Sequence, residues 1–181
     1  MGRPPLKKGA IERSALELFV EKGVDGTSIR DIAQRAGVTE GALYRHHRSK
    51  DDLVRHLYAQ SFTQFTEIVE SLGNQSTNPK DRVRLMIAQL VELHSRDSHV
   101  FRYVLVLHHK LLTEVRVGER DFVGALSRAI GGNSADFMAQ LVLGIIVQVS
   151  TAVEAGQLPG KLGDYSPRLI AAAMELVGKP L

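Results

Sequence analysis

The stretch TSIRDIAQRAGVTEGALYRHHRSK, Thr27 to Lys50, predicts two short helices joined by a tight turn. Its first half places apolar residues at three- and four-residue spacing, which is the spacing of one helical face. These residues are Ile29, Ile32, Ala33 and Ala36. Gly37 follows them, and glycine has the backbone freedom that a helix end often needs. The first helix is therefore expected to end at Gly37.

A second helix is expected directly after the turn. The Thr39 hydroxyl can cap its first turn, and Glu40 lies where the helix dipole favours an acid. Val38 and Leu43 would close a small apolar core against the first helix. Such a unit buries one side of its second helix and leaves the other side free to enter a DNA major groove.

These residues carry a family resemblance. The segment AGVTEGALYRH and the following SKDDLV resemble the DNA-binding domain of the TetR family of transcriptional regulators. One departure is His47, which stands where that family usually has an aromatic residue, most often Phe. The resemblance implies an all-α fold, with an N-terminal three-helix helix-turn-helix DNA-binding domain followed by a helical ligand-binding and dimerisation domain.

The resemblance also implies which residues contact DNA. It assigns phosphate contacts to Thr27, Tyr44, His46 and Lys50. It places Gly41, Ala42 and Arg45 toward the groove, with Thr39 at its edge. Arg45 is the expected reader of guanine, because its planar fork matches two acceptors on that base. A glycine at position 41 costs helix stability, which suits close approach to DNA but also suits a merely tolerant surface.

Composition and charge agree with this interpretation. The chain has 181 residues and no cysteine, which excludes disulfides and Cys-based metal sites. Residues 1–58 hold eleven Lys and Arg against eight Asp and Glu, whereas the rest of the chain is balanced. This small excess suits a phosphate-facing N-terminal part, although ordinary scatter also produces it. The N-terminus does not resemble a signal peptide and the apolar runs are short for a membrane span, so a cytoplasmic protein is expected.

Three domains are expected along the chain. Residues 1–9 (MGRPPLKKG) would form a flexible basic arm, either along the minor groove or free in solvent. Residues 10–52 would form the helix-turn-helix domain, and residues 53–181 the helical regulatory and dimerisation domain. Ser49 and Asp52 have the pattern of a capping box that opens a long helix between the two.

The last two helices, Phe137 to Ala155 and the helix opened by Ser166 and Pro167, are apolar on broad faces. Two such helices from each of two chains would form a four-helix bundle, which predicts a homodimer. The alternative is that both are central helices of a monomer. Earlier helices are expected after Asn78, after Asp97 or Ser98, and from Phe122 to Ile130, and Ser134 is expected to cap the first of the last two.

A cavity in the helical body would bind a small apolar or amphipathic effector. The candidate lining residues, for each of which simple core packing is the commoner role, are Phe62, Phe65, Met86, Leu90, His94, Phe101, Tyr103, Leu105, His108 and Phe137. The histidines of this region lack a spacing that puts two ligands on one helical face, so neither a metal nor a cofactor is predicted.

The expected function is a ligand-responsive transcriptional regulator. It would be a repressor that binds a palindromic double-stranded DNA operator as a homodimer and is released by its effector. The alternative is a structural or cell-cycle DNA-binding factor with the same fold and no effector. An enzyme is not expected, because no set of nucleophile, base and orienting residue is evident.

Overall fold

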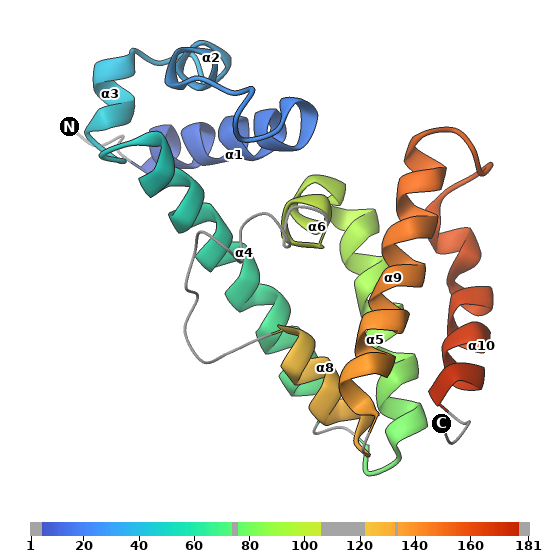
Figure 1. Cartoon of the computed structure of the whole chain (residues 1–181). Coiled ribbons are helices and arrows are strands. Elements are labelled where there is room, and N and C mark those ends of the chain that lie inside the picture. The colour runs from blue at the N-terminus through green and yellow to red at the C-terminus, as the bar shows by residue number, and fades with distance from the viewer. Residues whose placement is uncertain (1–4, 74–75, 106–121, 133, 178–181) are drawn as a thin grey trace. The chain divides into compact units, whose positions relative to one another are not determined.

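The computed structural model describes residues 5–73, 76–105, 122–132 and 134–177, and every regular element in these ranges is a helix (Figure 1). The all-α prediction is therefore confirmed. The chain divides into two compact units. The first unit comprises Met1–Ser61 and Arg102–Val115, and the second comprises Phe62–Phe101 and Arg116–Leu181.

The first unit is built on α1 (Pro5–Lys22), α2 (Ile29–Arg35), α3 (Glu40–Tyr44) and the first half of α4 (Lys50–Gly73). α2 packs against both α1 and α3, as expected for a three-helix core. The apolar side chains buried in this unit are Ile11, Ala15, Leu16, Leu18, Phe19, Ile32, Ala33, Ala42, Leu43, Leu53, Val54, Leu57 and Tyr58. Their spacing along each helix is that of a single inward face.

Helix α1 begins earlier than predicted. It starts at Pro5, whereas the flexible arm was expected to extend to residue 9. Proline suits the first turn of a helix, because the missing N–H would be unpaired there in any case. The prediction of an arm is therefore wrong for residues 5–9, and residues 1–4 lie outside the described residues.

A ring from far along the chain completes the core of the first unit. Tyr103, from α6 (Ser98–Leu105), is fully buried, and its ring lies 6.1 Å from that of Phe19 and 6.5 Å from that of Tyr58. Its hydroxyl donates a 3.0 Å hydrogen bond to the carbonyl oxygen of Val54, and burial raises the pKa of Tyr103 above its ordinary value. Tyr103 thus belongs to this core, which corrects its assignment to an effector site.

The second unit contains α5 (Pro79–Arg96), α8 (Phe122–Ile130), α9 (Ala135–Glu154), a 3-10 turn η1 (Leu162–Tyr165) and α10 (Ser166–Val177). α5 packs against α8 and α10, and α9 packs against the same two helices. The boundary between the two units lies within α4, after Ser61, whereas the sequence predicts it at residue 53. The reason is that the first turns of α4 bury Leu53 and Leu57 in the first unit.

Most of the predicted helix starts have the expected caps. The Asn78 side chain accepts a hydrogen bond from the Lys80 amide at 3.0 Å, and Asp97 accepts from the amides of His99 and Val100. Ser134 is the exception. It occupies the N-cap position of α9, but its side chain makes no capping hydrogen bond.

Helix α9 is long and apolar enough to cross a membrane by length and composition, and it is the only described helix that is. The core helix of a globular domain passes the same test. Since α9 packs against α8 and α10, its apolar character has an explanation inside the fold.

Candidate nucleic-acid interface

The helix α2 is fixed at its start by two reciprocal hydrogen bonds. The Ser28 hydroxyl oxygen accepts from the Asp31 amide at 3.1 Å, and the Asp31 carboxylate accepts from the Ser28 amide at 2.9 Å. The Ser28 hydroxyl also donates to the Asp31 carboxylate at 2.6 Å, and this bond, followed by that from the Ser28 amide, holds the pKa of the Asp31 carboxyl below its ordinary value. The spacing of Ser28 and Asp31, S-x-x-D, is the sequence pattern that indicates this capping box.

The turn between α2 and α3 has the predicted features. Gly37 has a φ of +64°, a conformation that favours glycine, and the Val38 amide donates to the Ala33 carbonyl at 3.0 Å. Thr39 caps α3, its hydroxyl oxygen accepting from the Ala42 amide at 3.2 Å. The cap predicted for Thr39 is therefore confirmed.

Helix α3 has one packed side and one exposed side. Leu43 is fully buried and Ala42 is 6% exposed. The exposed residues of α3 and its two ends are Thr39, Glu40, Gly41, Tyr44, Arg45 and His46. Ala42 lies on the packed side, so its expected position toward a groove is corrected. A residue one place from a groove-facing glycine on a helix points about a quarter turn away.

Thr27 is also buried rather than free. Its side chain is 2% exposed, and its hydroxyl lies 2.8 Å from the Gly23 carbonyl and 3.2 Å from the Leu18 carbonyl. The single hydroxyl proton is thus shared with the end of α1. A phosphate contact through the Thr27 hydroxyl is not supported by this placement.

Lys50 has a structural role beside the one expected of it. Its ammonium nitrogen donates to the Val24 carbonyl at 3.0 Å and to the Thr27 carbonyl at 3.1 Å. It therefore ties the loop between α1 and α2 to the first residue of α4. An ammonium group has three donors, so one is left for a phosphate.

A bidentate ion pair joins α1 and α2. The two terminal nitrogens of Arg35 each donate at 2.8 Å to the carboxylate of Glu21. Two parallel hydrogen bonds between a guanidinium and a carboxylate fix the relative orientation of the two side chains as well as their separation. Together with the caps of α2 and α3, this pair fixes the frame on which the exposed side of α3 is presented.

The candidate effector residues of the second unit pack mainly as a core. Phe62, Phe65, Met86, Leu90 and Phe101 are buried. Phe101 lies 6.4 Å from the ring of Phe65 and meets the His94 ring edge-on at 5.0 Å. These ring contacts join α4, α5 and α6 within that unit.

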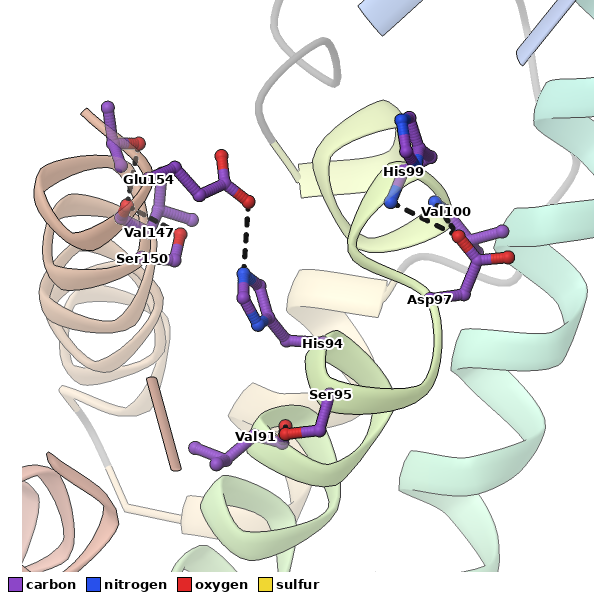
Figure 2. A network of polar contacts seen from close by, with 10 residues as sticks. Val91, His94, Ser95, Asp97, His99, Val100, Val147, Ser150 and Glu154 are labelled. Carbon is purple, nitrogen blue, oxygen red and sulfur yellow. Dashed lines mark hydrogen bonds and ion pairs between the residues drawn. The ribbon is translucent and has the colours of Figure 1, made fainter. Parts of the chain in front are cut away.

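His94 also carries a polar contact, shown in Figure 2. Its Nε2 lies 3.0 Å from a carboxylate oxygen of Glu154, so the pair bridges α5 and α9. The Ser150 hydroxyl, on the same helix as Glu154, donates instead to the Val147 carbonyl.

The other candidate effector residues lie elsewhere. Phe137 is 55% exposed on α9, so its assignment to an internal cavity is corrected. Leu105 is half-buried in the first unit, and His108 lies outside the described residues. The predicted set therefore does not converge on one place.

Residues 11–57 match the family model described as bacterial regulatory proteins, tetR family. These residues therefore form a domain of this family. The match spans α1, α2, α3 and the first turns of α4, which form the packed unit with the exposed α3 surface.

The similar proteins are named as regulators rather than enzymes, which agrees with the expectation that the chain is not an enzyme. It is 31% identical over 107 residues to the HTH-type transcriptional repressor KstR2 of Mycobacterium tuberculosis, covering 56% of this chain and 52% of that protein. It is 27% identical over 161 residues to the HTH-type transcriptional regulator TtgR of Pseudomonas putida, covering 86% of this chain and 70% of that protein.

A solved structure shares the fold over most of the chain. The transcriptional regulator FadR from Bacillus subtilis, in complex with stearoyl-CoA, aligns with a TM-score of 0.67 and 19% identity, covering 92% of this chain and 97% of that one. The sequence match to KstR2 is more limited, since the chain spans about half of that repressor's length.

Gly41 provides a test of the exposed surface. A Cβ built at this position would have no atom of the described chain within 4 Å. The fold therefore has room for alanine. We expect Gly41→Ala to leave the Tm unchanged or slightly raised, because alanine favours a helix by up to about 1 kcal/mol. We expect DNA affinity to fall about tenfold, since the added methyl would collide with the duplex.

The measurements are thermal unfolding and fluorescence anisotropy with a labelled DNA fragment from upstream of the gene. Gly163→Ala is the matched control, since a Cβ there also meets open space and the residue lies in the second unit. Unchanged DNA affinity in Gly41→Ala would show that the glycine belongs to a merely tolerant surface.

Proposed function

We propose that this chain is a cytoplasmic transcriptional repressor that binds a palindromic DNA operator as a homodimer and is released by an amphipathic effector. The observation that carries the DNA-binding part is the exposed side of α3. Arg45, Tyr44 and His46 stand exposed there, while Leu43 anchors the opposite side in the core. A short capped helix presented in this way fits a major groove.

Each exposed side chain has a chemistry suited to duplex DNA. The Arg45 guanidinium offers paired donors for the O6 and N7 acceptors of guanine. Tyr44, which is 49% exposed, His46 and the remaining donor of Lys50 suit phosphate oxygens. Thr39 lies at the edge, where its hydroxyl still has a proton to donate. Ala42 and Thr27 have no part in this proposal, because the fold buries their side chains.

Dimerisation is proposed through α9 and α10. On α9, Phe137 is exposed, and Leu141, Ile145 and Val149 are only half-buried. Apolar side chains left open along one helix favour a partner surface. A second copy would bring a second reading helix, and two half-sites one helical turn apart bind far more tightly than one.

The effector class is proposed from chemistry and from one relative. The structure of Bacillus subtilis FadR contains stearoyl-CoA, a long apolar chain with an anionic head. The second unit has the apolar side chains that an acyl chain requires, among them Phe65, Met86 and Phe101. α4 is one uninterrupted helix that supplies residues to both units, so a ligand that moves it acts on both.

Substitutions of Arg45 and Lys50 are expected to change DNA binding in different ways. Arg45→Ala should cost about 1–3 kcal/mol at the preferred site and reduce the preference between sites, because it removes base readout. Lys50→Ala should weaken binding to all sequences alike and reduce the slope of log affinity against log salt by about 1. The measurement is an anisotropy titration of several DNA sequences at several salt concentrations.

Arg96→Ala is the control for these titrations, since that arginine has a side chain 74% exposed in the second unit. The salt slope matters because Lys50 also binds two carbonyls, and loss of that contact alone would lower stability without changing the slope. Identical loss patterns for Arg45→Ala and Lys50→Ala would contradict the two assigned roles.

Phe137→Glu is expected to separate the dimer. A carboxylate would be buried in an apolar interface, which is strongly unfavourable. Sedimentation velocity should show a dimer for the wild-type chain and a monomer for the variant, with weaker operator binding. Gln89→Glu introduces the same charge at an exposed position of α5 and should remain a dimer. A monomeric wild-type chain would refute this part of the proposal.

Stearoyl-CoA is expected to raise the Tm and release DNA, whereas coenzyme A without the acyl chain is expected to do neither. A ligand at 100 times its dissociation constant stabilises by about 2.7 kcal/mol, which for this size is a rise of roughly 5–10 °C. Differential scanning fluorimetry and anisotropy check both effects. If no acyl thioester changes either quantity, the structural factor without an effector becomes the better interpretation.

A further inference from the structure

Three titratable side chains from three segments of the first unit lie close together, and one of them is buried. Glu12 comes from α1, His47 from the turn between α3 and α4, and His56 from α4. We call them the acid–imidazole cluster. His47 has a side chain only 3% exposed, whereas His56 is 39% exposed. His47 is also the residue that departs from the usual aromatic of the resemblance.

The cluster is centred on one carboxylate oxygen. Glu12 Oε1 lies 2.9 Å from Nε2 of His56 and 3.7 Å from Nε2 of His47. The two imidazole rings are 5.2 Å apart, centre to centre. Glu12 Oε1 and His47 Nε2 are buried, and within the described chain neither has an aligned hydrogen bond. Buried polar atoms without partners are rare and call for an explanation, because leaving them unpaired is costly.

Other charges face the cluster from the surrounding elements. From α1, Lys8 Nζ lies 3.6 Å from Glu12 Oε1. From α4, Asp52 Oδ2 lies 3.9 Å from Nδ1 of His47, and the same oxygen accepts from the Arg48 amide. Burial, and then His56, lower the pKa of His47, while Glu12 and Asp52 act in the opposite direction. Burial and the neighbouring imidazole prevail, so His47 is neutral near pH 7.

We propose that the acid–imidazole cluster is a proton-binding site at which acid pH loosens the joint between the α3–α4 turn, α1 and α4. A proton on His47 places positive charge in the interior, beside His56 and near Lys8. That charge is costly in the interior, and the structure relieves it by opening the turn that follows the reading helix.

The direction of the pH effect follows from the lowered pKa of His47. The unfolded chain binds a proton at its ordinary pKa near 6.5, while the folded chain resists it. Stability is therefore fully present above that value and is lost as the pH falls below it. Acid should also weaken DNA binding by disturbing α3, a step that rests on the proposed function. Simple protonation of the exposed His46 would instead strengthen binding to phosphates.

The test is thermal unfolding of the full chain between about pH 7.5 and about pH 5.5. The wild-type Tm should fall by about 3 °C or more, a shift that corresponds to a modest stability change in a chain of this size. In His47→Phe, which keeps an aromatic ring, the fall in Tm should be less than half that of the wild-type chain. In Glu12→Gln the fall in Tm should be larger than in the wild-type chain, because this variant removes a carboxylate that favours protonation of His47.

His99→Gln is the control, since it removes a histidine from the second unit, and its Tm should fall as much as that of the wild-type chain. The proposal would be overturned if the Tm of His47→Phe fell as much as that of the wild-type chain. It would also be overturned if the Tm of Glu12→Gln fell less. Stabilisation by ZnCl₂ at neutral pH that disappears in His47→Phe would also overturn it, because the cluster would then hold a metal.

Two further measurements test the proposal even if a variant fails to fold. NMR titration of the wild-type imidazoles should show His47 titrating below its ordinary pKa, and an ordinary value would refute the site. Anisotropy should show weaker DNA binding at acid pH in the wild-type chain but not in His47→Phe. If no DNA binds at any pH, the proposed function fails while the stability measurements still decide on the proton site.

Discussion

The burial of Leu43 is the contact on which the rest of the first unit depends. α3 has only five residues, and a helix of that length is not stable by itself in water. Its position is set by the fully buried Leu43, by the Thr39 cap and by the turn at Gly37. The polar side of α3 is exposed because the opposite side is committed to the core. The packing of Leu43 in the core is therefore also what leaves Arg45 exposed.

Several polar residues near this surface make hydrogen bonds that stabilise the fold itself. Lys50 holds the loop after α1 through the carbonyls of Val24 and Thr27, and the Thr27 hydroxyl closes the end of α1. Ser28 and Asp31 fix the start of α2. A residue type at a given position in a resemblance therefore does not by itself say whether its side chain contacts DNA or supports the residues that do.

The helices, caps and turns that depend on neighbouring residues were predictable from the sequence. The burial of single side chains, which depends on residues far away in the chain, was not. Helical spacing, the Thr39 and Ser49 caps and the break at Gly37 were all evident from neighbouring residues. The burial of Ala42 could not be read in the same way, because it depends on which side of a very short helix faces the core. Tyr103 was misassigned because its partners lie far away in sequence. Phe137 was misassigned because an apolar residue gives no sign of whether it meets its own core or solvent.

The placement of Tyr103 limits how freely this protein can be divided. Its ring covers Phe19 and Tyr58, and its hydroxyl serves the Val54 carbonyl, yet it follows the second unit's first residues in the chain. An N-terminal fragment cut at Ser61 would lack the Tyr103 ring between Phe19 and Tyr58 and the hydrogen bond from Tyr103 to the Val54 carbonyl. Domain exchange with a relative would therefore have to carry α6 along with the N-terminal helices.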